Sequence, residues 1–144
     1  MGLLIDQKKK VVVYCRHSRE NAQENSIPLQ LERLYRYGDE NNLHIIHVEK
    51  DEGESGLTAD RPGFQSLLKS WVMHPERTKL FEGILFFDVS RMGRFQALDE
   101  FGYYTFLCKQ HGKWVWYVDL GMLPDKQDPM HHLIIAMKQA AAAD

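Results

Sequence analysis

The sequence predicts one α/β domain with an open, mostly parallel sheet and helices on both of its faces. Short runs that are apolar throughout, at residues 11–14 and 84–87, suit central strands that are covered on both sides. Segments with apolar residues at helical spacing separate these runs, and strands that alternate with helices are typical of a parallel sheet. With 144 residues the chain is long enough to bury one core, so we expect a single domain.

The first elements follow from local signals. Residues 1–10 end in three lysines and have no periodicity, so we interpret them as a flexible leader before the strand that starts at Val11. Ser26 can cap a helix that tolerates Pro28 in its first turn and runs to about residue 42. The apolar face predicted for this helix consists of Leu29, Leu31, Leu34, Tyr35 and Tyr37.

The remaining elements alternate in the same way. We expect a strand at 44–49, a glycine-punctuated loop at 51–56, a helix that starts at 60–63, a strand at 84–87, a helix at 96–111, a strand at 114–118 and a last helix from about 129. The expected inward residues are Phe64, Leu67, Leu68 and Trp71 in the second helix and Leu98, Phe101, Phe106 and Leu107 in the third. The apolar face of the last helix consists of Met130, Leu133, Ile134, Ala136 and Met137.

Composition excludes several classes of protein. The formal charge of −2 and the pI near 6.4 give no overall basic signature, so any contact with nucleic acid must come from a local cluster of arginines. Cys15 and Cys108 are best interpreted as small core residues, which favours a reducing, cytoplasmic location. No apolar run has membrane-spanning length, and the leader lacks the apolar core of a signal peptide.

Polar side chains follow the predicted strands and begin the predicted helices. If the first strand stays extended past Tyr14, Arg16 and Ser18 point to the same side, at the sheet edge where ligands bind in open α/β folds. Arg91 and Arg94 are three residues apart and share a face if the segment is helical. With these we group Gln30 and Arg61, which lie at predicted helix starts.

One hydroxyl among four arginines describes a site in which a serine attacks a phosphate. The planar guanidinium matches phosphate oxygens and stabilises the charge that grows on phosphorus in the transition state. The alternative is that the arginines are solvated or paired with acids such as Asp60, Asp88 and Asp99.

Four motifs in this order resemble the catalytic domain of the serine recombinases, the family of resolvases, DNA invertases, large integrases and transposases. They are Tyr14-x-Arg16-x-Ser18; Ser26-Ile27-x-x-Gln30; Glu54-Ser55-Gly56 followed by Asp60-Arg61-Pro62-Gly63-Phe64; and Ser90-Arg91-Met92-Gly93-Arg94. The resemblance covers residues 11–144 and implies a resolvase-like three-layer fold.

The resemblance also implies the chemistry. Ser18 would be the nucleophile on a DNA phosphodiester, with a 5′-phosphoserine intermediate, strand exchange and religation. Arg16, Arg61, Arg91 and Arg94 would bind and activate that phosphate, and Gln30 matches the family's active-site glutamine. The implied partners are DNA and further copies of the chain, as a dimer and a synaptic tetramer, with no metal, no cofactor and no membrane.

Some features depart from the family pattern. Many small resolvases have aspartate where this chain has Ser90, and Asp88 lies two residues earlier, whereas serine at this place and a long loop after Ser18 favour the larger integrases and transposases. The long oligomerisation helix and the DNA-binding region expected after Asp144 are absent, so inactivity of the isolated fragment is the first complication we expect. The resemblance leaves integration, inversion, resolution and transposition open.

Other interpretations are weaker. His44 with His47, and His131 with His132, lack the partners of a metal site, and strand alternation turns His17 away from Ser18. A nucleotide-binding domain would need a glycine-rich loop after the first strand, which is missing. A non-catalytic assembly or regulatory domain with the same fold stays open as the alternative function.

Overall fold

The computed structural model describes residues 8–17, 26–52, 62–87, 98–121 and 137. These residues form a parallel four-stranded sheet in the order β2-β1-β3-β4. The strands are β1 (Lys9–His17), β2 (Leu43–Glu52), β3 (Gly83–Phe86) and β4 (Trp114–Tyr117). The predicted parallel α/β sheet is therefore confirmed.

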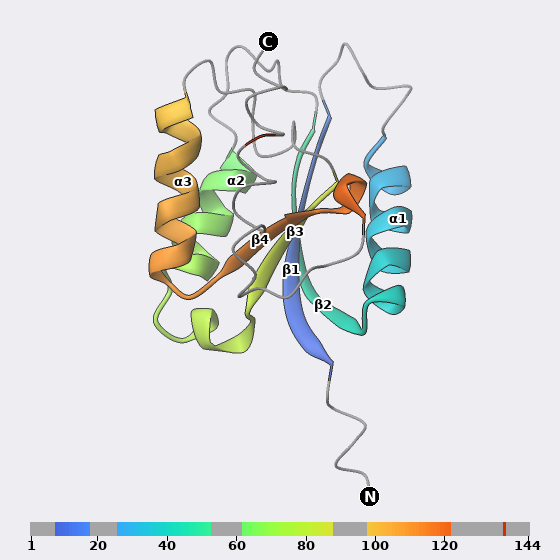
Figure 1. The fold of residues 1–144 in the computed structure, drawn as a ribbon, viewed down its shortest axis with the longest axis horizontal. Helices are drawn as coiled ribbons and strands as arrows, with labels where there is room; N and C mark the ends of the chain where they lie inside the picture. The colour runs from blue at the N-terminus through green and yellow to red at the C-terminus, as the bar shows by residue number, and fades with distance from the viewer. Residues whose placement is uncertain (1–7, 18–25, 53–61, 88–97, 122–136, 138–144) are drawn as a thin grey trace, which may run out of the picture.

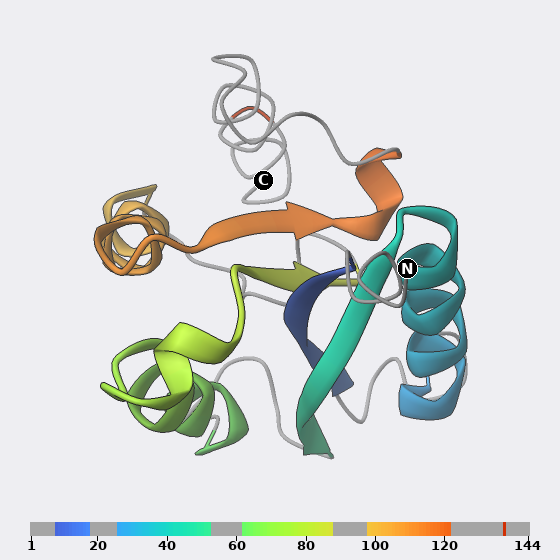
Figure 2. The same ribbon diagram turned by 90° about the horizontal axis from the view of Figure 1, so that it is seen from below.

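Helices cover both faces of this sheet. Helix α1 (Ile27–Glu40) lies on one face, and α2 (Pro62–Leu67) and α3 (Leu98–Gln110) lie on the other (Figures 1 and 2). A π-helical turn, η3 (Leu68–Val72), continues α2, and two 3₁₀ turns, η4 (Arg77–Leu80) and η6 (Val118–Leu120), precede β3 and follow β4. The three predicted layers are thus present.

The core lies between the sheet and its helices. Residues 11–15 of β1 are all 0% exposed, because β1 is a central strand with neighbours on both sides and helices above and below. Cys15 and Cys108 are buried, free cysteines, as expected. At Gly83 a Cβ atom would lie 2.2 Å from the Trp114 ring, so only glycine allows β3 to pass this indole.

The order of the strands creates a switch point between β1 and β3. The chain leaves β1 through α1 to reach β2 on one side, and leaves β3 through α3 to reach β4 on the other. Ligands of open α/β sheets bind outside the carboxyl ends of the strands at such a point. The segments that directly follow β1 and β3 contain Ser18 and Arg91 respectively.

Several predicted boundaries and faces are wrong. Strand β1 begins at Lys9, inside the expected leader, and β2 continues through Asp51, which the sequence had placed in a loop. Tyr35 is 49% exposed and Phe106 is 57% exposed, so the prediction that these two side chains lie on the core-facing sides of their helices is wrong. The buried face of α1 consists of Ile27, Gln30, Leu34, Tyr37 and Gly38.

The third and last predicted helices are described only in part. Leu107 packs against the core as expected. The side chains of Leu98 and Phe101 lie outside the description, as does the last helix apart from Met137, which is helical and 64% exposed. No helix among the described residues is long and apolar enough to cross a membrane.

Candidate active site

The carboxyl end of β1 carries the described part of the candidate site. Arg16 is the penultimate residue of this strand and is only 5% exposed, and Gln30 of α1 is fully buried beside it. The other predicted site residues lie outside the described residues, as do Asp88 and Ser90. They are Ser18, Arg61, Arg91 and Arg94.

Gln30 holds the backbone of Arg16 through both ends of its amide. The Gln30 Nε2 donates to the carbonyl oxygen of Arg16 at 3.0 Å, and the Arg16 N–H donates to the Gln30 Oε1 at 3.3 Å. Helix α1 supplies this side chain because Ser26 caps its first turn, accepting from the Leu29 N–H at 3.4 Å. Gln30 therefore fixes the strand end from which Ser18 follows two residues later.

Asp51 is a buried carboxylate that sequence reasoning missed. It is 3% exposed and pairs in register with Arg16 across the β1–β2 ladder. The hydroxyl of Tyr14, which is fully buried, donates to Asp51 Oδ2 at 2.5 Å. A short hydrogen bond to an ionised carboxylate is among the stronger polar contacts in proteins, so this pair ties β1 to β2 beside the candidate site.

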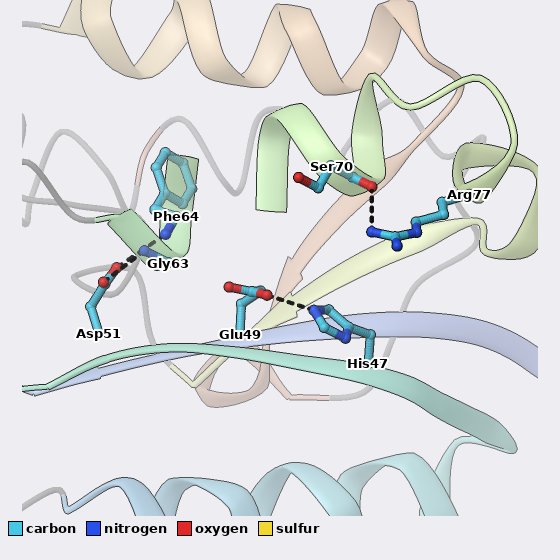
Figure 3. A network of polar contacts seen from close by, with 7 residues as sticks. All are labelled: His47, Glu49, Asp51, Gly63, Phe64, Ser70 and Arg77. Atoms are coloured by element: carbon cyan, nitrogen blue, oxygen red, sulfur yellow. Dashed lines mark hydrogen bonds and ion pairs between the residues drawn. The ribbon is translucent and has the colours of Figure 1, made fainter. Parts of the chain in front are cut away.

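The same carboxylate anchors the start of α2. The Gly63 N–H donates to Asp51 Oδ1 at 2.8 Å and the Phe64 N–H donates to Oδ2 at 3.0 Å (Figure 3). A Cβ at Gly63 would lie 2.5 Å from the Lys50 carbonyl oxygen, so glycine is required for this close approach. These bonds fix the first turn of α2, and Arg61 immediately precedes this helix in the sequence.

Aromatic rings from four elements pack next to the Tyr14–Asp51 pair. Tyr14 packs edge-on against Phe64 at 5.4 Å and against Phe86 at 5.9 Å between ring centroids. Phe64 in turn packs against Tyr104 of α3 at 5.2 Å. Edge-to-face pairs of this kind add to the stability gained by burial, so these rings join β1, β3, α2 and α3 next to the site.

Comparison with known families identifies the domain. The sequence model described as "Resolvase, N terminal domain" matches residues 11–143. The chain belongs to this resolvase family. A comparison with curated proteins gave no match.

Solved structures share the fold. The N-terminal catalytic domain of TP901-1 integrase has 22% identity and a TM-score of 0.70, with 92% of this chain and 93% of that chain covered. A resolvase family site-specific recombinase from Streptococcus pneumoniae has 22% identity and a TM-score of 0.70, with 94% and 86% covered. The C-terminal catalytic domain of ISC1926 TnpA, an IS607-like serine recombinase, has 25% identity and a TM-score of 0.62, with 89% and 78% covered.

One of the two histidines of β2 packs against an aromatic ring in this resolvase domain. His47 stacks on Trp71 with ring centroids 4.1 Å apart, and its Nε2 lies 2.7 Å from Glu49 Oε1 (Figure 3). His44 is exposed. Among the described residues there is no group of three side chains that could hold a metal ion.

A periodic signal could have revealed Asp51. His47, Glu49 and Asp51 occupy every second position of β2, and their side chains point toward the α2 side of the sheet (Figure 3). This period-two pattern continues the strand to Asp51, whereas the nearby glycines favoured a loop. Tyr14 stood in the recognised motif without a role, and its hydroxyl proves to be the partner that a buried carboxylate needs.

Proposed function

We propose that this domain is the catalytic domain of a serine recombinase, which cleaves and rejoins DNA during site-specific recombination. The observation that carries the proposal is the fixed end of β1. There Gln30 clamps the backbone of Arg16 at the switch point of the sheet, two residues before the candidate nucleophile. The motif order and the resolvase family assignment support the same reaction.

In the proposed reaction the Ser18 oxygen attacks a DNA phosphorus atom. The bond from phosphorus to the 3′ oxygen of the neighbouring nucleotide breaks, that oxygen leaves as a hydroxyl, and the serine proton is released. The product is a phosphodiester between Ser18 and the DNA 5′ end. Because one phosphate ester replaces another, the exchanged 3′ hydroxyl can attack the phosphoserine and rejoin DNA without metal or high-energy cofactor.

The arginines would carry the electrostatic part of this reaction. Arg16, Arg61, Arg91 and Arg94 are assigned to the attacked phosphate, where positioned positive charge stabilises the transition state. In this proposal Gln30 and Asp51 do not touch the phosphate but position other parts of the site. Gln30 fixes the backbone of Arg16, and Asp51 fixes the helix start that follows Arg61. Strand exchange itself would take place in a synaptic tetramer.

A covalent adduct tests the proposal. The native full-length protein is mixed with labelled DNA that carries its candidate recombination site, and denaturing gels detect protein that stays attached to a DNA 5′ end. We expect an adduct with the native protein and none with Ser18→Ala, although Ser18→Ala still binds the DNA. Ser70→Ala, on η3, is the matched control and should form the adduct normally.

The alternative function is a non-catalytic assembly or regulatory domain with the same fold. Under this alternative the protein binds DNA or its own copies, and no adduct depends on Ser18. DNA binding without an adduct in the native protein, under conditions in which recombination of that DNA proceeds in the source cells, would therefore replace the proposed function with this alternative.

A further inference from the structure

A positively charged surface lies where the strands of the sheet begin, at the opposite end of β1 from Arg16. An open cleft of about 250 Å³ separates the start of β1 from the turn that follows η4. Both segments lie at the lower end of the molecule in Figure 1, where the strands begin. The cleft is lined by Lys8, Lys9, Lys10, Lys79, Leu80, Phe81 and Glu82, and we call it the lysine cleft.

The four lysines of the cleft form no ion pair with the described residues. All four are exposed. Glu82 is the single acid of the lining, and its carboxylate accepts from the Trp114 Nε1 at 3.2 Å. The chain as a whole has a net charge of −2, so this concentration of positive charge is local.

A fifth lysine binds the backbone of the segment that lines one side of the cleft. Lys113 is 8% exposed, and its Nζ donates to the carbonyl oxygen of Phe81 at 2.7 Å and to that of Thr78. Its ammonium group also lies 4.3 Å from the centre of the Phe81 ring. Lys113 therefore holds the backbone on both sides of Lys79 and Leu80.

We propose that the lysine cleft binds the phosphate backbone of duplex DNA at a place separate from the scissile phosphate. Lysine offers a mobile point charge that suits phosphate oxygens without reading sequence. Interfaces between proteins are depleted in lysine and enriched in aromatic residues, whereas DNA-binding surfaces are strongly positive. Leu80 is the one large apolar side chain that the lining exposes, which favours DNA over a protein partner.

This inference goes beyond the proposed function because it involves neither Ser18 nor the arginines. It adds a non-catalytic contact that would hold DNA against the domain while the opposite edge of the sheet performs the reaction. The contact would be independent of DNA sequence and sensitive to salt.

Salt-dependent binding tests the lysine cleft. The 144-residue chain is titrated with a labelled random duplex at several salt concentrations, alongside the triple variant Lys9→Gln/Lys10→Gln/Lys79→Gln. Each lost phosphate contact removes about 0.9 from the slope of log affinity against log salt. If three contacts are lost, a fourfold rise in salt weakens the native chain by roughly 40-fold more than the variant.

Two controls separate this result from a general loss of charge. The variant Arg33→Gln/Lys69→Gln/Lys109→Gln removes three other exposed cations and should keep the native slope. Ser70→Ala, which changes no charge, should also bind the random duplex like the native chain. The test needs no recombination activity, so failure of the proposed chemistry leaves it intact. The replaced lysines and Arg33 are exposed, and equal thermal unfolding midpoints would verify that the variants fold.

NMR gives a second measurement, because it locates the residues that DNA contacts. Amide NMR signals of residues 8–10 and 79–82 should shift when the duplex is added to the native chain. Equal slopes for the native chain and the triple variant, with unshifted signals, would overturn the proposal. A triple variant that loses self-association while its DNA affinity is unchanged would also overturn it, because the cleft would then serve a second copy.

Discussion

At the residue scale, Gln30 does for β1 what a neighbouring strand does elsewhere in the sheet. The register between β1 and β3 ends at Tyr14 with Phe86, so β3 no longer runs beside β1 at Arg16. A glutamine amide has a donor and an acceptor in fixed geometry and can therefore satisfy both peptide groups of one residue. A polar residue at the centre of the buried face of α1 thus supports the site through the backbone.

We predict that Gln30→Met destabilises the domain. Methionine keeps most of the volume but leaves the buried N–H and C=O of Arg16 without the amide, which costs about 2–4 kcal/mol of unfolding free energy. Urea denaturation measures the change. Gln110→Met replaces an exposed glutamine and should change the free energy by less than about 0.5 kcal/mol. Equal stability of the two variants would contradict the role of Gln30.

At the scale of elements, Asp51 joins β1, β2 and α2 through one carboxylate. It accepts one hydrogen bond from a side chain of β1 and two from the first turn of α2, which has only six residues. So short a helix has little stability of its own and depends on tertiary contacts. The position of the first turn of α2 therefore depends on its hydrogen bonds to Asp51.

Replacement of the carboxylate by an amide should loosen the start of α2. In Asp51→Asn one of the two side-chain positions becomes an NH₂ group that faces a backbone or hydroxyl donor, so we expect a loss of about 2–3 kcal/mol of unfolding free energy. Tyr14→Phe removes one bond and should cost about 1–2 kcal/mol. Asp39→Asn on the exposed side of α1 is the control.

The double variant makes this prediction sharper. Because Tyr14 and Asp51 share a hydrogen bond, the losses in Tyr14→Phe and Asp51→Asn should sum to more than the loss in the double variant. Hydrogen exchange should also show faster opening of the amides of Gly63 and Phe64 in Asp51→Asn. Strict additivity, or unchanged exchange at these amides, would show that the carboxylate does not anchor α2.

At the scale of the whole molecule, the strands could be predicted from apolar patterns in the sequence, whereas contacts between residues that are far apart in the sequence could not. Continuous apolar runs identified the central strands because burial on both faces leaves no other pattern. The buried face of α1 was predicted wrongly because Gln30 is polar and Tyr35 is apolar. Gln30 is buried because its amide binds the backbone at the end of β1, which side-chain polarity does not reveal. Asp51 was missed because its partners, Tyr14 and Gly63, are brought to it only by the fold.

The same packing sets how the molecule responds to alkaline solution. Burial raises the pKa of the Cys108 thiol to about 12, and burial also raises the pKa of the Tyr37 and Tyr117 hydroxyls above their usual 10.0. The Tyr37 hydroxyl donates to the Gly121 carbonyl oxygen at 2.9 Å. In the folded state these three groups keep their protons, whereas in the unfolded chain they lose them from about pH 9 to 10 upward.

The unfolded state therefore binds fewer protons than the folded state in this range, and the unfolding free energy falls as pH rises. Each fully buried group contributes a slope of about 1.4 kcal/mol per pH unit. Lys113 acts in the opposite direction, because burial lowers the pKa of its ammonium group and the unfolded state then binds more protons. Three groups against one give a net loss of stability above about pH 10.

We predict that Cys108→Ala makes this loss shallower. The variant removes one titrating group, so its unfolding free energy between pH 9 and about 12 should fall with a slope smaller by about 1.4 kcal/mol per pH unit. Urea unfolding at a series of pH values measures both slopes. A constant offset between the variant and the native chain would mean only lost packing. Parallel curves over this range would therefore show that the Cys108 thiol does not titrate differently in the two states.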